Sequence, residues 1–142
     1  MTTMTTKRRV VIDTSVLISA ALIEQGKPHA TVFYILEHEN LLASSNTFHE
    51  LETRLRRTKF LRYLHVEKRE AYLTFIRERS RFIPITETIT ACRDPKDDIF
   101  LELAVSGQAE MILSSDNDLL VLHPFRGIAI LKPAAFLETV TL

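Results

Sequence analysis

Short apolar segments rich in β-branched residues alternate along this chain with segments of helical spacing. No Asn-Gly or Asp-Gly hairpin signal joins any two of them. Residues 9–13 (RVVID) are too continuously apolar for a strand with one face in solvent, so a central position in a parallel sheet is expected. Strands that alternate with helices are typical of α/β proteins. The sequence therefore predicts a three-layer α/β/α sandwich around a mainly parallel sheet.

The same patterns predict the bounds of the other elements. Further strands are expected at residues 41–43 or 41–44, 81–85, 109–115 and 127–131, and helices at 14–24, 29–39, 47–57, 67–81, 96–108 and 133–140, with shorter helical turns at 58–66 and 116–122. The helix over 47–57 is expected to be capped by Ser45 or Asn46. Asp94 is the expected cap of the helix over 96–108, with Pro95 at its first position.

Length and composition indicate a single domain, residues 1–142, with residues 1–8 as a flexible N-terminal tail. No apolar run approaches the ~20 residues that a membrane span needs, and the N-terminus lacks the apolar region of a signal peptide. A cytoplasmic protein without membrane contact is therefore expected. The single cysteine, Cys92, excludes an internal disulfide and a cysteine metal cluster.

Charge is unevenly distributed although the formal net charge is zero. Between Thr53 and Arg81, ten lysines and arginines stand against three glutamates, whereas both flanking parts of the chain carry net negative charge. Such asymmetry within one domain suggests a polyanionic partner.

Five acidic residues are expected at one edge of the predicted sheet. They are Asp13 at the end of the first strand, Glu50 early in the third helix, Asp97 in the first turn after the Asp94 cap, and Asp116 and Asp118 directly after the fourth strand. Ligands of open parallel sheets bind outside the carboxyl ends of the strands. These side chains are therefore predicted to converge on a shared site.

A divalent cation is the simplest way to neutralise these acids, because no lysine or arginine lies in residues 10–17 or 113–120. Mg²⁺ and Mn²⁺ prefer carboxylate and water oxygens, and one or two carboxylates plus waters usually hold one ion. One or two ions are thus expected. Two ions ~4 Å apart could hold the attacking and the leaving oxygen of an in-line phosphoryl displacement. The five histidines show no metal-ligand spacing, and none is predicted to belong to the site.

Each acid also has a structural explanation when it is taken alone. Asp13 could cap the following helix, and Glu50 could be a solvated helix residue. Asp98 could be a first-turn acid favoured by the helix dipole, and Asp118 could form an Asx turn. The ordered set, rather than any single residue, favours a metal site.

Four segments carry a resemblance to a known family. They are VVIDTSVLISAAL, NTFHELETRL, RDPKDDIFLELAVSGQAEMILSSDNDLLVL and AILKPAAFLE, which together span residues 9–138. The chain resembles the PIN domain, and more narrowly the branch related to VapC toxins of bacterial toxin–antitoxin pairs. This resemblance implies a parallel-sheet sandwich fold and an endoribonuclease that depends on Mg²⁺ or Mn²⁺.

The resemblance also implies roles for individual residues. The four catalytic, metal-binding acids fall on Asp13, Glu50, Asp97 and Asp116, with Asp118 and Asp98 as further candidate ligands, and Thr14, Ser15 and Ser114 fall on site-lining hydroxyl positions. Asp97 is preferred to Asp98 because it lies seven residues before Ala104, the spacing that the family's helix suggests. Glu52 remains an alternative to Glu50, since the choice depends on where the helix begins.

Partners follow from the resemblance and the basic segment together. RNA is the implied substrate, and Arg54, Arg56, Arg57 and Lys59 could guide it through phosphate contacts. Phe60, Tyr63 and Tyr72 lie among these cations and could stack on bases. The resemblance further implies a cognate antitoxin and a homodimer, for which residues 59–81 are a candidate face.

Two other functions remain open at this point. A receiver-type phosphoacceptor domain is suggested by Lys132-Pro133 after the last strand, but the first strand offers a single acid and no middle strand ends in aspartate. The second alternative is a PIN domain that binds RNA or a partner protein without catalysis. Loss of metal binding without loss of RNA binding on mutation of Asp13 would separate the site from the scaffold.

Overall fold

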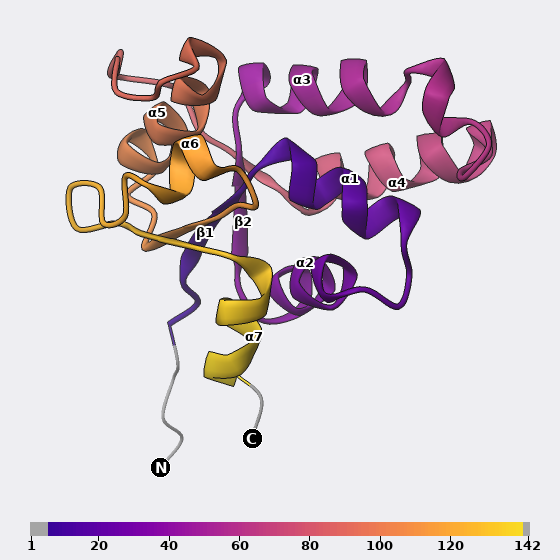
Figure 1. Ribbon diagram of the computed structural model, residues 1–142, viewed down its shortest axis with the longest axis horizontal. Helices are drawn as coiled ribbons and strands as arrows, with labels where there is room; N and C mark the ends of the chain where they lie inside the picture. The colour runs from indigo at the N-terminus through magenta and orange to yellow at the C-terminus, as the bar shows by residue number, and fades with distance from the viewer. Residues whose placement is uncertain (1–5, 141–142) are drawn as a thin grey trace.

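Five parallel strands in the order β3-β2-β1-β4-β5 form the centre of the protein in the computed structural model, which describes residues 6–140 (Figure 1). The strands are β1 (Arg9–Ile12), β2 (Asn40–Ala43), β3 (Arg81–Phe82), β4 (Met111–Leu113) and β5 (Ala129–Leu131). The helices are α1 (Thr14–Leu22), α2 (Lys27–His38), α3 (Ser45–Leu55), α4 (Val66–Arg79), α5 (Asp98–Ser106), α6 (Asn117–Leu120) and α7 (Pro133–Val140), with 3₁₀ turns at Thr58–Phe60 and Pro95–Asp97. The predicted α/β fold with a parallel sheet is confirmed.

Alternating side chains of the strands divide the core between the two faces of the sheet. Val10 and Ile12 of β1 pack with residues of α1, α2, α3, α4 and α7. Val11 points to the opposite face and packs with α5 and α6. Because successive strand residues point to opposite faces, a strand that is apolar at every position is covered on both sides. Figure 1 shows the resulting layers, with α5 and α6 on one side of the sheet and α1 to α4 on the other.

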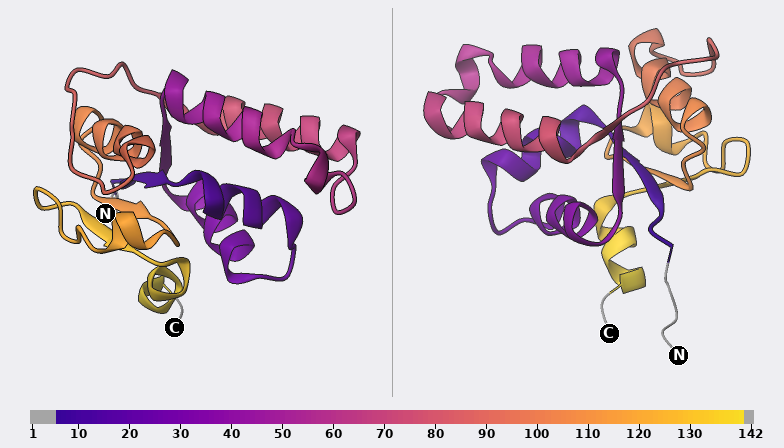
Figure 2. Two further views of the ribbon diagram at one scale, coloured as in Figure 1. Left: turned by 45° about the horizontal axis from the view of Figure 1, so that its top comes forward. Right: turned by 180° about the vertical axis from the view of Figure 1, so that it is seen from behind.

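Strand β3 is shorter than the predicted strand over residues 81–85. Its pairing with β2 continues for one more bond, in which the Ile83 N–H donates to the Ala43 carbonyl over 2.8 Å. Pro84 follows and has no N–H to donate, so the ladder ends there. The chain then crosses to the other side of the sheet and runs along α5 (Figure 2).

Several predicted helix starts differ from the observed ones. Asp94 accepts from the Lys96 N–H over 3.0 Å and caps the 3₁₀ turn Pro95–Asp97, whereas α5 itself begins at Asp98. Ser44, rather than Ser45 or Asn46, caps α3, because its side chain accepts from the Thr47 N–H over 3.1 Å in a capping box. Helix α2 begins at Lys27 instead of His29, with Pro28 in its first turn, where proline is tolerated.

The predicted N-terminal tail extends too far. Residues 1–5 lie outside the described residues, but Arg8 belongs to the folded part. Its backbone N–H and its guanidinium both bind the Glu39 carboxylate, at 3.0 and 2.5 Å. Its carbonyl accepts from the Asn40 N–H over 2.9 Å. The fold therefore includes Arg8, one residue before β1.

Helices α3 and α4 lie side by side and extend together away from the sheet (Figures 1 and 2). Arg56 at the end of α3 binds Glu70 of α4 at 2.6 Å, and Arg69 binds the same carboxylate at 2.8 Å. Arg77 of α4 binds Glu52 of α3 at 3.3 Å. We call this pair of helices with its connecting residues the α3–α4 arm. Across residues 6–140, no helix is long and apolar enough to cross a membrane.

The sheet order brings the ends of β1 and β4 together. The Asp13 N–H donates to the Leu113 carbonyl over 3.0 Å, and the Ser114 N–H donates to the Leu131 carbonyl over 2.9 Å. Crossovers leave β1 and β4 in opposite directions along the sheet, which is the arrangement that opens a crevice for ligands. The residues that directly follow these strands therefore line one edge.

Candidate metal centre

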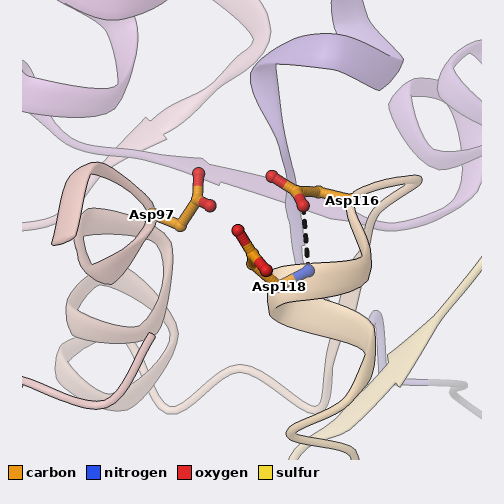
Figure 3. A group of neighbouring side chains, drawn as sticks. All are labelled: Asp97, Asp116 and Asp118. Atoms are coloured by element: carbon orange, nitrogen blue, oxygen red, sulfur yellow. Dashed lines mark hydrogen bonds between the residues drawn. The ribbon is translucent and has the colours of Figure 1, made fainter. Parts of the chain in front are cut away.

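Three carboxylates meet at this edge. Asp97 comes from the turn before α5, and Asp116 and Asp118 from the start of α6 (Figure 3). One oxygen of each lies within 4.8 Å of the others. At such distances three negative charges repel strongly, by ~4 kcal/mol per pair at an effective dielectric of about 20. A cation or a bound proton would relieve this repulsion.

Asp116 is held by a relay of hydrogen bonds from the neighbouring strand end. Its N–H donates to Ser114 Oγ over 2.9 Å, and the Ser114 hydroxyl in turn donates to Asp13 Oδ2. Its own Oδ1 accepts from the Asp118 N–H over 2.9 Å and so caps α6 (Figure 3). Asp13 and Ser114, which directly follow β1 and β4, thus position Asp116.

Asp13 is almost fully buried, with 3% of its surface exposed. Its Oδ1 accepts from the Val16 N–H over 2.9 Å and caps α1. Burial raises the pKa of Asp13, the bonds from Ser114 and from the backbone oppose this, and the charge of Asp116 raises it further. Asp13 therefore caps α1 through one oxygen and accepts from Ser114 through the other, but it is not one of the three clustered acids, and its role as a site acid stays a prediction.

Asp97 shows most directly that the site suits a cation. Its Oδ2 is buried and has no hydrogen-bond partner, although such oxygens are normally paired. Burial, the close carboxylate of Asp116, and the charges of Asp94 and Glu50 raise the pKa of Asp97 to about 7. A hard divalent cation would supply the missing partner and neutralise the charge, so the donor set fits Mg²⁺ or Mn²⁺.

A cleft of about 690 Å³ opens beside these acids. Glu50 lies in its wall, together with Asp97 and Asp116, and its Oε1 accepts from Arg54 over 3.0 Å. Glu52 instead binds Arg56 and Arg77 within the α3–α4 arm. The structure thus brings Glu50, rather than Glu52, to the predicted site.

Asp98 points away from this group. Its Oδ1 accepts from the N–H groups of Ala91 and Cys92, over 3.1 and 2.8 Å, and its side chain is buried. Burial favours the neutral form, but the donors from Cys92 and Ala91 hold the pKa of Asp98 below its usual range. Asp98 therefore fastens the segment before the site to α5, as Glu102 does by accepting from the Ile89 N–H over 3.0 Å.

We expect Asp98→Ala to lower the free energy of unfolding by about 2 kcal/mol, because two part-buried hydrogen bonds lose their charged acceptor. Urea denaturation at pH 7 measures this, and Asp98→Asn, which keeps one acceptor oxygen, should lose less. Since the pKa of Asp98 is lowered by folding, its contribution is present above its unfolded pKa and fades as the pH falls below it. Unchanged stability in Asp98→Ala would contradict this anchoring role.

The predicted hydroxyl residues occupy different places. Ser114 is buried and forms the relay described above. Ser15 lies in the wall of the cleft. Thr14 is buried, and its Oγ1 has no hydrogen-bond partner.

The predicted RNA-binding cations divide into two groups. Arg54 and Arg57 line the cleft. Arg56 is bound to Glu70 on the other side of α3, and the Lys59 ammonium lies over the Phe60 ring, 5.0 Å from its centre. Neither of these two lines the cleft.

Among the aromatic residues, Tyr72 is unavailable for base stacking. Its hydroxyl donates to the Leu17 carbonyl over 2.7 Å, and burial raises its pKa. Phe60 is partly buried against the core. Tyr63 is 64% exposed on the α3–α4 arm and remains a candidate for stacking.

The cleft also contains residues that the sequence analysis did not assign to the site. Asn46, His49 and Thr53 line it from α3, and Asp94 and Lys96 line it from the opposite side. No histidine was predicted to belong to the site; His49 lines the cleft but does not belong to the acidic group. Helical spacing from Glu50 was the available signal for Asn46 and Thr53.

The strand order separates this fold from the receiver-type alternative. Receivers have the order 2-1-3-4-5, with their phosphoacceptor at the switch point of that sheet. Here the order is 3-2-1-4-5, and Lys132 only precedes α7, which begins at Pro133. The receiver interpretation is therefore wrong.

Solved structures support the same fold. VapBC2 from Rickettsia felis, bound to a DNA fragment from its promoter, superposes with a TM-score of 0.60 at 10% identity, over 86% of this chain and 96% of that chain. PAE2754 from Pyrobaculum aerophilum superposes with a TM-score of 0.64 at 17% identity, over 94% of this chain and 90% of that chain. No curated protein matches the sequence.

A family model described as PIN domain matches residues 9–118. The match begins at the first residue of β1 and ends at Asp118, so it includes both strand ends and all the acids of the candidate site. Because it covers well over half of the chain, the protein belongs to the PIN domain family.

Proposed function

We propose that this protein is an endoribonuclease that hydrolyses RNA phosphodiester bonds with Mg²⁺ or Mn²⁺. The observation that carries the proposal is the convergence of Asp97, Asp116 and Asp118, with the buried Oδ2 of Asp97 unpaired. Membership of the PIN domain family supports it, because the matched residues 9–118 include all the acids of the candidate site.

The metal would be held by Asp97 and Asp116, with Asp118 as a further ligand and with Asp13 and Glu50 completing the acidic set. When bound, one or two such ions supply Lewis acidity and an activated water for attack on phosphorus. The ligands are carboxylates only, which matches the preference of hard cations and leaves space for water in the open cleft.

The remaining work falls to the chain's own residues. Asp13 and Ser114 are buried and fix the orientation of Asp116 through the hydrogen-bond relay. Preorganised groups of this kind stabilise developing charge without reorganisation during the reaction. Arg54, Arg57 and Lys96, in the walls of the same cleft, offer positive charge to the phosphates of the substrate.

We further propose that the protein is the toxin of a toxin–antitoxin pair. The fold is similar to that of VapBC2, and the sequence resembles the VapC-related branch of the family. A cognate antitoxin would inhibit cleavage by covering the acidic site or the RNA path. A homodimer through residues 59–81 is also proposed.

Cleavage of a mixed RNA pool by the purified protein tests the proposed activity. We expect cutting with Mn²⁺ or Mg²⁺, none with a chelator, and none from Asp13→Asn or Asp97→Asn. A pool that includes transfer, ribosomal and messenger RNA covers the three substrate classes. Binding of RNA without metal-dependent cutting of any of them would favour the alternative, a PIN domain that binds without catalysis.

A further inference from the structure

One face of α3 lines the cleft over its whole length and continues past its end. Asn46, His49 and Glu50, then Thr53 and Arg54, and finally Arg57 follow one another at alternating spacings of three residues and one residue. Residues three and four apart share a helix face. At 1.5 Å per residue, Arg57 lies roughly 10 Å along this face from Glu50.

The two neighbouring arginines at the end of α3 differ in their surroundings. Arg56 is bound to the Glu70 carboxylate at 2.6 Å and also lies 3.6 Å from Glu52. Arg57 is exposed, lines the cleft and forms no ion pair with any carboxylate of residues 6–140. Its charge is therefore available to an anion in the cleft, whereas that of Arg56 is largely neutralised.

The opposite wall of the cleft also carries a cation without an ion pair. Lys96 is exposed there between Asp94 and Asp97, and no ion pair to its ammonium is found within the described chain. Glu50, Asp97 and Asp116 line the cleft, and Arg57 follows Glu50 by seven residues along the same wall. A polyanion could thus have one phosphate at the acids and another at Arg57.

Size and composition indicate the form of that polyanion. The cleft volume of about 690 Å³ is in the range of pockets for drug-sized ligands, so it accommodates a few nucleotides of one strand and no duplex. No phenylalanine or tyrosine of residues 6–140 lines it. Contacts would therefore be to phosphate and sugar, which give affinity without sequence choice.

We infer that the cleft face of α3 is a track for single-stranded RNA, in which Arg57 binds a backbone phosphate a short distance along the strand from the phosphate at the acids. A separation of ~10 Å corresponds to roughly three stacked nucleotides at 3.4 Å each, or fewer in an extended strand. The inference rests on the proposed function for its substrate class. It adds a named phosphate-binding residue, Arg57, and a path for the RNA strand along α3.

Binding of labelled single-stranded RNA by full-length protein tests the track. Fluorescence anisotropy in Mg²⁺, with Asp116→Asn as an uncleaving background, compares a 12-nucleotide strand with a dinucleotide over a series of salt concentrations. Arg57→Gln should weaken binding of the longer strand about tenfold and make the salt slope shallower by about 0.7. It should leave the dinucleotide, which is too short to reach Arg57 from the acids, nearly unaffected.

Arg56→Gln is the matched control, since it removes an adjacent cation outside the cleft and should change RNA binding little. Equal losses from both variants would mean a general electrostatic effect and would overturn the track. Equal binding of duplex and single strand would overturn it as well. So would an Arg57→Gln variant impaired only in binding a cognate antitoxin, because the cleft would then be a protein-docking site.

The outcome for the track is separable from that for the proposed activity. If wild-type protein binds RNA through Arg57 but cuts none of the pool, the nuclease proposal fails and the track stands. If it cuts with metal while Arg57→Gln binds like wild type, the track fails and the nuclease proposal stands.

Discussion

Asp116→Asn is expected to lower the rate of metal-dependent RNA cleavage by roughly 1,000-fold or more, the upper range for loss of one group that stabilises developing charge. Asp116 contributes to the three-carboxylate group, and its N–H, which the substitution retains, completes the relay through Ser114 to Asp13. The shape of the side chain is almost unchanged, so the fold should persist. Single-turnover cleavage with excess enzyme measures the loss.

Glu87→Gln is a suitable control for Asp116→Asn. Glu87 is a partly exposed acid that binds Arg126 at 2.6 Å and does not line the cleft. This variant should cleave like wild type, and circular dichroism should show both variants folded. If Asp116→Asn retained more than about a tenth of the wild-type rate, Asp116 would not be a catalytic ligand. Such a loss would be smaller than the loss usually seen when one charge-stabilising group is removed.

Asp97→Asn is expected to have opposite effects on stability without and with metal. In chelator at pH 8, the variant should be more stable than wild type by about 1 kcal/mol, after allowance for partial exposure of the site. This corresponds to about 3 °C in Tm. With Mn²⁺ at 100 times its Kd, wild type should gain about 2.7 kcal/mol, and the variant should gain little because it has lost a ligand.

The sign of the pH dependence follows from the direction of the pKa shift. Asp97 ionises near 3.8 in an unfolded chain and at about 7 in the folded protein, so between these values the folded state binds more protons. The stability of metal-free wild type should therefore fall as the pH rises through this window. Asp97→Asn should lack that decline. Thermal scans at several pH values test this, and a metal-free variant less stable than wild type at pH 8 would contradict it.

The adjacent aspartates 97 and 98 show what a sequence can and cannot predict about this site. The family resemblance, through the spacing to Ala104, favoured Asp97 as the ligand; the structure brings Asp97 and not Asp98 into the acidic group, and its role as a ligand stays a prediction. The role of Asp98 depended on two N–H groups, of Ala91 and Cys92, that reach it only because Pro84 ends β3 and sends the chain along α5. Such a non-local contact leaves no local pattern, so Asp98 remained a candidate ligand until the structure placed it.

Strands β1 and β4 were predictable for the opposite reason. Their continuous apolar character records burial on both faces, which is a local signal. Helix starts were less certain, because Ser44, Ser45 and Asn46 are all good caps and the choice depends on where β2 ends. The division of the cations was also beyond the sequence, since Arg56 and Arg57 are adjacent and differ only through the position of Glu70 on α4.

The separation of acids at the sheet edge from cations on the α3–α4 arm gives the protein a large electric dipole despite its zero formal charge. Near its isoelectric point of about 7, no net repulsion keeps copies apart. At low ionic strength the arm of one copy and the acidic edge of another should attract, and salt should weaken that attraction. Neutral, low-salt solutions should therefore be those in which this protein is least soluble, and added salt or a polyanion should dissolve it.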